Sequence, residues 1–191
     1  MHRFVLIFIV LTIIIIYSEI LTENFEIIKQ MASDNKMYYV QNFEDNKEAA
    51  DILSGISKQC SALVENLTVK YPNDSDVLRL QKKFNPDNMR EAVDSNGQTS
   101  YTINKGEMVH LCLRHKDDEK SLHDHNLLMF VTIHELAHIM SKSIGHNQEF
   151  YKNFKFLLTE AVEAGIYSPV NFQSNPVKYC GVNVTNNPYF E

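Results

Sequence analysis

Cysteine is scarce in this sequence of 191 residues: only Cys60, Cys112 and Cys180 occur, and none belongs to a C-x-x-C pair. Zinc sites built from thiolates usually draw on such pairs, so the pattern disfavours one here. An odd number of cysteines permits at most one disulfide, with one thiol left over. The sequence does not indicate which two would pair, and three buried thiols are the simpler expectation.

A surplus of positive charge is also missing. Lysine and arginine number 18 against 24 aspartate and glutamate residues, which gives a net charge of −6 and a pI of about 5.7. Proteins that hold phosphate backbones usually present a basic surface, so we do not expect nucleic acid as the partner. Internal repeats are absent too, and the length suits one domain with a hydrophobic core.

The amino-terminal segment has almost no polar residues. Between Phe4 and Tyr17, only Thr12 interrupts a run of apolar side chains. Extended to residue 21, the run is long enough to span a bilayer, and no small-residue cleavage site follows it. We therefore expect residues 1–21 to be a single-pass membrane anchor, with a cleaved signal peptide and secretion as the alternative. Arg3 before the run, and acidic residues after it, favour a domain across the membrane from the amino terminus.

Periodicity divides the remaining chain. Residues 22–45 lack firm periodicity, and we expect a stalk or linker there. From residue 46 onward apolar residues recur at three- and four-residue spacing, which predicts an amphipathic helix of about five turns. A break near Pro72 follows, after which Asp74 or Ser75 can cap a short helix. Residues 46–191 are therefore expected to form the folded domain.

Two short runs predict strands. Residues 99–103 and 108–114 flank an Asn-Lys-Gly turn, which indicates a β-hairpin. In the second strand, Val109, Leu111 and Leu113 point to one face. We expect Val109 to Arg114 to form an exposed edge along which an extended peptide can pair. One further strand is expected near Tyr179 and Val182.

The most informative stretch follows that hairpin. Apolar residues 127–133 lead into His134, Glu135 and His138, an H-E-x-x-H pattern on a predicted helix. Positions four apart lie on one helix face, so the two histidines can bind one zinc ion with the glutamate beside it. Gly145 is expected to end this helix, and a second helix is expected to begin at Asn147.

A hydrolytic zinc site needs a third protein ligand and one open position. His146 is the preferred candidate, because Gly145 allows the chain to turn so that the next side chain returns to the metal. A carboxylate on the second helix, from Glu160 or Glu163, is the alternative.

Glu135 is expected to be a general base rather than a ligand. Zinc lowers the pKa of bound water to about 7, and a nearby carboxylate can take its proton and pass it to a leaving amine. A peptide bond suits this chemistry, because its amine leaves poorly without a proton. Either Tyr167 or Tyr179 could donate a hydrogen bond to the tetrahedral intermediate, although core packing is the simpler interpretation of both. His123 and His125 could bind metal, but polar loop positions explain them as well.

With these residues the chain resembles the WLM and SprT-like zincin metallopeptidases. The resemblance covers about residues 99–165 and rests on the apolar lead-in, the His134-Glu135-Leu136-Ala137-His138 motif and Gly145-His146-Asn147 with Phe150. It implies a small α+β fold with the active-site helix packed on a short β-sheet or hairpin. It also implies one Zn²⁺ ion held by His134, His138 and His146, with Glu135 as the catalyst.

The expected function is therefore that of a membrane-tethered, zinc-dependent endopeptidase acting on a protein or peptide. Known family members often cut proteins crosslinked to DNA, but the acidic charge of this chain does not favour that substrate. Two alternatives stay open: a non-catalytic, zinc-stabilised interaction domain at a membrane, and a DNA-associated protease.

Overall fold

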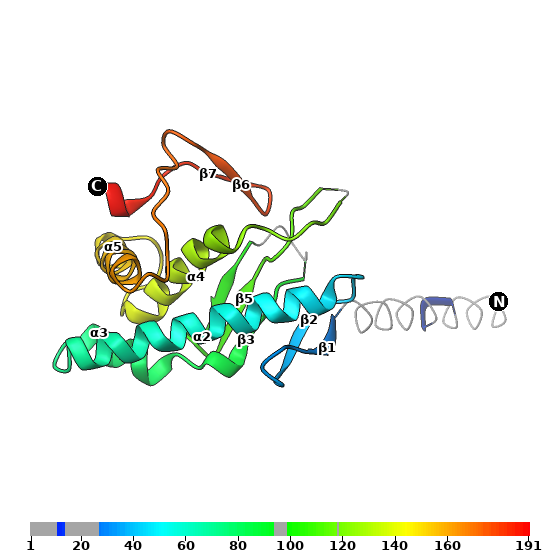
Figure 1. Cartoon of the computed structure of the whole chain (residues 1–191), viewed down its shortest axis with the longest axis horizontal. Coiled ribbons are helices and arrows are strands. Elements are labelled where there is room, and N and C mark those ends of the chain that lie inside the picture. The colour runs from blue at the N-terminus through cyan, green and yellow to red at the C-terminus, as the bar shows by residue number, and fades with distance from the viewer. Residues whose placement is uncertain (1–10, 14–26, 94–98, 118) are drawn as a thin grey trace, which may run out of the picture.

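The computed structural model describes residues 11–13, 27–93, 99–117 and 119–191. These residues confirm an α+β fold in which helices and three small sheets alternate along the chain (Figure 1). The expected anchor at residues 1–21 lies almost wholly outside the described residues and stays a prediction. Among the described helices, none is both long and apolar enough to cross a membrane.

The first long helix, α2, runs from Asn46 to Lys70 and confirms the predicted amphipathic helix. Its apolar stripe is buried, with Leu53 and Ile56 fully inaccessible to solvent. Burying one such side chain contributes about 1.5–3 kcal/mol, so the stripe is a main source of core stability. Helix α3 (Ser75–Lys83) follows, and the Asp74 side chain caps it by accepting hydrogen bonds from the Asp76 and Val77 backbone N–H groups.

The expectation of a stalk at residues 22–45 is wrong for the described part. Strands β1 (Ile27–Met31) and β2 (Met37–Gln41) form an antiparallel hairpin that packs against α2. Alternate side chains of β2, Tyr38 and Val40, are buried in the core. This period of two spans only five residues among many polar ones, which explains why the pattern was too short to recognise. The folded domain therefore begins no later than Ile27.

The central sheet has the strand order β3-β5-β4. Strand β4 (Tyr101–Ile103) pairs antiparallel with β5 (Met108–Leu111), as predicted, but β5 also pairs in parallel with β3 (Met89–Glu91). Strand β3 contains only three residues, too few to show a period of two in the sequence. As a result, the expected exposed edge at residues 109–114 is wrong: β5 is the middle strand, and β3 and β4 are the edges.

Helices α4 (His125–Met140) and α5 (Gln148–Glu163) lie next to each other beyond this sheet (Figure 1). Asp124 caps the first and Asn147 caps the second. The first helix ends at Met140, five residues before the glycine that was expected to end it. Ser141 takes an extended conformation, which ends the helix. Its hydroxyl donates a hydrogen bond to the Ala137 carbonyl oxygen.

The carboxyl-terminal part forms a hairpin rather than a single strand. Strands β6 (Val177–Tyr179) and β7 (Val182–Val184) pair antiparallel around a turn in which Cys180 and Gly181 both have positive φ angles. A disulfide joins this turn to Cys112, directly after β5, and Cys60 is a free, buried cysteine of α2. The expectation of three buried thiols is therefore wrong. The chain ends in a short 3₁₀ helix at Pro188–Phe190, which resembles another such turn at Pro86–Asn88.

Candidate active site

Three histidine side chains converge at one end of α4. The Nε2 atoms of His134 and His138 are 3.2 Å apart, and the Nε2 atom of His146 lies 3.0 Å from the former and 3.2 Å from the latter. The first two residues are one helical turn apart, so their proximity follows from local geometry. The third comes from the loop between α4 and α5, so its position depends on how that loop is held.

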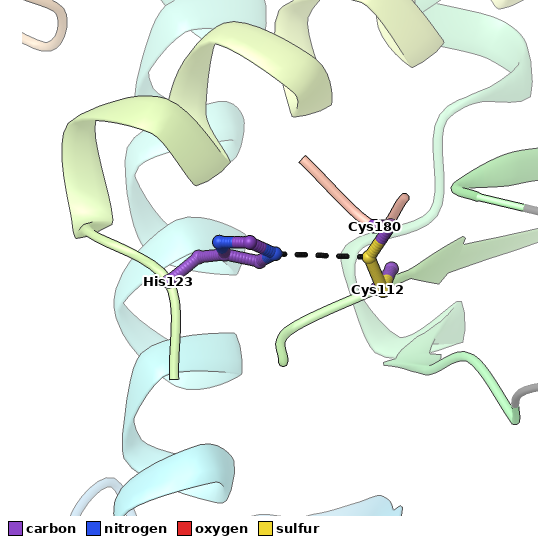
Figure 2. Close-up of side chains that lie close together, drawn as sticks. All are labelled: Cys112, His123 and Cys180. Atoms are coloured by element: carbon purple, nitrogen blue, oxygen red, sulfur yellow. Dashed lines mark hydrogen bonds between the residues drawn. A yellow bond between two sulfur atoms is a disulfide. The ribbon is translucent and has the colours of Figure 1, made fainter. Parts of the chain in front are cut away.

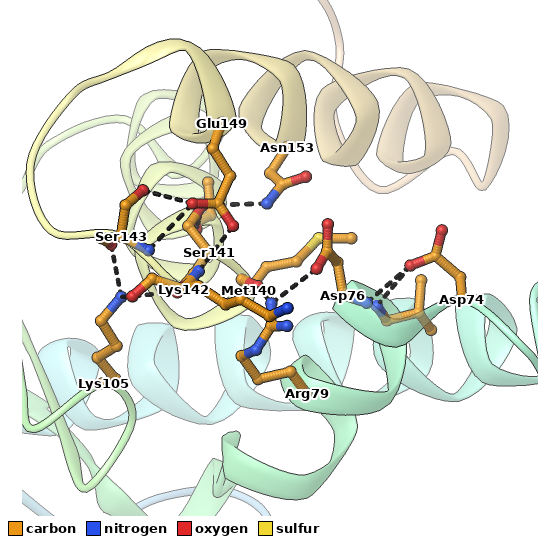
Figure 3. A network of polar contacts seen from close by, with 12 residues as sticks. Asp74, Asp76, Arg79, Lys105, Met140, Ser141, Lys142, Ser143, Glu149 and Asn153 are labelled. Carbon is orange, nitrogen blue, oxygen red and sulfur yellow. Dashed lines mark hydrogen bonds and ion pairs between the residues drawn. The ribbon is translucent and has the colours of Figure 1, made fainter.

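A network of polar contacts holds this loop (Figure 3). The Lys105 ammonium group, from the turn between β4 and β5, donates to the backbone carbonyl oxygens of Ser141, Lys142 and Ser143. The Glu149 carboxylate accepts hydrogen bonds from the Lys142 and Ser143 backbone N–H groups and from the Ser143 hydroxyl.

Two further contacts anchor the start of the loop. Arg79 of α3 donates to the Met140 carbonyl oxygen, and Asn153 of α5 donates to the Ser141 hydroxyl (Figure 3). Gly145 then takes a φ of 83°, in the left-handed region, immediately before His146. The glycine thus lets the chain turn as predicted, although it does so inside a loop and not at the end of a helix.

Phe150 packs beneath the three imidazoles. Its ring is fully buried, and its centre lies 4.3 Å from that of His138, 4.7 Å from His146 and 4.8 Å from His134. Burial lowers the pKa of His134 to about 3 and that of His138 to about 4. Both imidazoles are therefore neutral at neutral pH, the form that binds a metal ion.

Glu135 is a buried carboxyl group beside this cluster. Its exposed fraction is 4%, and burial raises its pKa to about 7. The Thr102 hydroxyl of β4 donates to its Oε2 atom over 2.7 Å, which partly offsets that effect and fixes the orientation of the carboxylate. A carboxyl group whose pKa lies near neutrality suits proton transfer in both directions.

A cleft of about 770 Å³ opens over these groups. The edge strand β4 and the loop residues Ser143 to His146 form two of its sides, and β7 contributes Val182 and Val184. Its lining also includes Phe130 and Phe154, so apolar surface adjoins the polar cluster. An elongated ligand lying in this cleft would therefore run beside the backbone of β4.

The alternative third ligands lie elsewhere. The Glu160 carboxylate contacts the Lys70 ammonium group and the Tyr71 hydroxyl, and Glu163 contacts the same lysine. Neither glutamate lines the cleft.

The two candidate tyrosines lie in different places, one at the cleft and one in the core. Tyr179 is buried at the wall of the cleft, and its hydroxyl lies 2.5 Å from the Ser100 Oγ atom. The Tyr167 hydroxyl instead accepts hydrogen bonds from the Val170 backbone N–H and the Asn187 side chain, in the core.

His123 and His125 do not form a site together. The Nε2 atom of His125 contacts the Gln59 side chain, whereas His123 is buried beside Cys112 and Cys180. The cluster of His123 with the two cysteines could not be predicted from the sequence, and neither could the contacts of Thr102 and Lys105. Each depends on residues that are far apart in the chain.

Comparison with known proteins adds a family and several viral relatives. The WLM domain matches residues 32–188. An uncharacterized protein of Acanthamoeba polyphaga mimivirus is 34% identical over 152 residues, 78% of this chain and 77% of that protein. An uncharacterized protein of Invertebrate iridescent virus 6 is 40% identical over 80 residues, 41% of this chain and 44% of its own length. Another, of Invertebrate iridescent virus 3, is 44% identical over 72 residues, 38% of this chain and 44% of its own length. No solved structure matches.

Proposed function

We propose a function from two findings: the chain belongs to the WLM domain family, and three of its histidines converge beside a buried glutamate. The family is one to which metallopeptidase activity is ascribed. We infer that the chain is a zinc-dependent endopeptidase with a zincin-like catalytic domain. The observation that carries the proposal is the meeting of the His134, His138 and His146 Nε2 atoms at one point.

The distances between these nitrogens fit a single zinc ion. Nitrogen ligands at 2.0–2.1 Å from one ion, in tetrahedral directions, lie roughly 3.3 Å from each other. The observed separations of 3.0 to 3.2 Å are close to that value. His134, His138 and His146 would hold the ion and leave one coordination position open. When bound, zinc lowers the pKa of a water molecule and polarises a carbonyl group.

Glu135 performs the proton transfers in this proposal. Its carboxylate takes a proton from the attacking water and returns it to the amine of the broken peptide bond. Thr102 holds the carboxylate in place through the hydrogen bond to Oε2. Tyr179, whose ring lines the same cleft, donates a hydrogen bond to the oxygen that becomes negatively charged.

The edge strand β4 binds the substrate. Among the described residues, β4 pairs only with β5, so the backbone groups on its other side can pair with an extended peptide. Residues 99–102 line the cleft from this side. The substrate is therefore a segment of protein that can adopt an extended conformation.

Two substitutions test the function. Glu135→Gln should keep zinc bound while lowering the rate of peptide cleavage by about 10²–10⁴-fold, because the general base is lost. His134→Ala should abolish zinc binding at the three-histidine site, and cleavage with it. Cleavage is measured with a peptide library and an unfolded protein substrate, and zinc by elemental analysis.

His125→Ala is the matched control, because this histidine starts the same helix but contacts Gln59 outside the cleft. It should leave zinc content and cleavage unchanged. Undiminished cleavage by Glu135→Gln would contradict the assigned role of the glutamate. Full zinc occupancy in the wild type with no cleavage of any substrate would instead support a non-catalytic domain.

A further inference from the structure

His123 is buried with an incomplete set of hydrogen bonds. Its side chain is 3% exposed, and its Nδ1 atom has no hydrogen-bond partner. Its Nε2 atom faces the sulfur of Cys180 at 3.7 Å (Figure 2). Sulfur is a weak acceptor, and an unpaired polar atom in the interior is costly. With the disulfide formed, the imidazole faces a sulfur atom and the Arg114 backbone, and its Nδ1 atom stays without a partner.

The same imidazole completes a set of metal-binding atoms. The Nε2 atom of His123 and the sulfur atoms of Cys112 and Cys180 all lie within 4.8 Å of one another, and all three residues are buried. Thiolates and a neutral imidazole are preferred zinc ligands. These residues come from the end of β5, the loop before α4 and the turn between β6 and β7, so only the folded chain brings them together.

We propose that reduction of the Cys112–Cys180 disulfide creates a second zinc site, formed by Cys112, Cys180 and His123. A small thiol reductant converts the disulfide to two thiols and is itself oxidised to a disulfide. The two thiols then bind Zn²⁺ as thiolates and release two protons to solvent, while the His123 Nε2 atom donates its lone pair.

The backbone can accommodate either cross-link. The Cα atoms of the two cysteines are 6.4 Å apart, toward the upper end of the range for disulfides, so the sulfurs can separate by side-chain rotation. The ring of His115 packs against that of His123, with 3.9 Å between the ring centres, and a water molecule would take the fourth coordination position. Two cysteines and one histidine, with water in the fourth position, form a known set of zinc ligands.

The proposed site would keep the active-site cleft assembled in a reducing environment. Cys180 lies between Tyr179 and the Val182 end of β7, and both of these residues line the cleft. The disulfide ties this turn to the central sheet in an oxidising environment. Zinc bound by the same cysteines would tie it there when the disulfide cannot form.

Metal analysis of the full chain tests the inference. The chain, reduced with dithiothreitol and dialysed against zinc under argon, should contain one more zinc ion than the oxidised chain. Cobalt in place of zinc should give a thiolate-to-cobalt charge-transfer band in the reduced chain only. The three-histidine site contains no sulfur, so it cannot produce this band.

Two histidine variants provide the comparison. His123→Ala should lose the additional zinc ion and most of the cobalt band when reduced, yet still form the disulfide when oxidised. His125→Ala, two residues away, should retain both signals. An intact disulfide and an unchanged melting temperature in the oxidised His123→Ala variant would show that it folds.

The result that overturns the inference is a reduced wild-type chain with free thiols, no additional zinc and no thiolate band. This outcome is independent of the proposed peptidase activity. If His134→Ala left all zinc binding and cleavage unchanged while the thiolate band persisted, the peptidase proposal would fail and the second site would stand.

Discussion

Single side chains in this protein carry functions that depend on their burial. The Glu135 carboxyl group is 4% exposed, and its pKa is raised to about 7 because water is excluded around it. The Thr102 hydroxyl is the hydrogen-bond donor that orients it. The motif itself identifies the glutamate, but nothing in the motif specifies a threonine 33 positions earlier as its partner.

Tyr179→Phe is predicted to slow peptide cleavage by about 10²-fold, because one hydrogen bond to the negatively charged oxygen is lost. Zinc content should stay the same, since the tyrosine is not a ligand. Steady-state kinetics on one peptide substrate measure the effect, which should fall on kcat more than on KM.

Tyr167→Phe is the matched control for this prediction. It also removes a buried tyrosine hydroxyl, but one that contacts Val170 and Asn187 away from the cleft. Equal kinetics for the two variants would show that Tyr179 contributes only to packing.

At the scale of elements, the loop from Ser141 to Asn147 decides whether the site forms. Its backbone carbonyl groups accept hydrogen bonds from Lys105. The Ser143 hydroxyl and the backbone N–H groups of the loop donate to Glu149, which lowers the pKa of that carboxyl group to about 2. Helix α4 ends at Met140, and the loop held by these hydrogen bonds then brings His146 back to the other two histidines.

Glu149→Gln is predicted to weaken zinc binding by about 10-fold. The amide cannot reproduce the charge-assisted hydrogen bonds to Lys142 and Ser143, so the loop loses part of its support, and residues that orient metal ligands typically change affinity by roughly 10–100-fold. Competition with a chromophoric chelator measures the dissociation constant. Glu163→Gln, on the same helix but paired with Lys70, should bind zinc as the wild type does. Identical affinities for both variants would rule out this role of Glu149.

At the scale of the whole molecule, several buried histidines couple stability to pH. Burial lowers the pKa of His110, His123 and His138 to about 4 and that of His134 to about 3. In the unfolded chain a histidine has a pKa of about 6.5. Between these values the unfolded state binds protons at the four histidines that the folded state does not. These protons outweigh the one that the folded state holds on Glu135, whose pKa is raised to about 7, so acidification favours unfolding.

The free energy of unfolding of the metal-free, oxidised chain is therefore predicted to fall as the pH is lowered from about 7 toward 4. Urea unfolding in the presence of a chelator, repeated at several pH values, measures the slope. Excess zinc should raise stability at pH 7 and lose this effect on acidification, because protons compete for the same nitrogens. A metal-free chain of constant stability across this range would contradict the prediction.

Features that depend on neighbouring residues could be predicted from the amino-acid sequence. The spacing of His134 and His138 places both on one face of α4, and the apolar periodicity of α2 and α5 specifies helices with one buried side. The hairpin of β4 and β5 follows from its turn residues. In each case the responsible contacts span only a few positions, so local geometry suffices.

The remaining features depend on contacts between distant segments of the folded chain. The pairing of Cys112 with Cys180 joins positions 68 apart, and the hydrogen bonds from Lys105 to the loop span 36 to 38 positions. Strand β3 pairs with β5 and makes it the centre of the sheet, so that β4 is an edge strand. The absence of C-x-x-C pairs disfavours thiolate ligands, yet folding places two distant cysteines beside a buried histidine. Such contacts arise only when separate segments pack together, and no local pattern encodes which segments will meet.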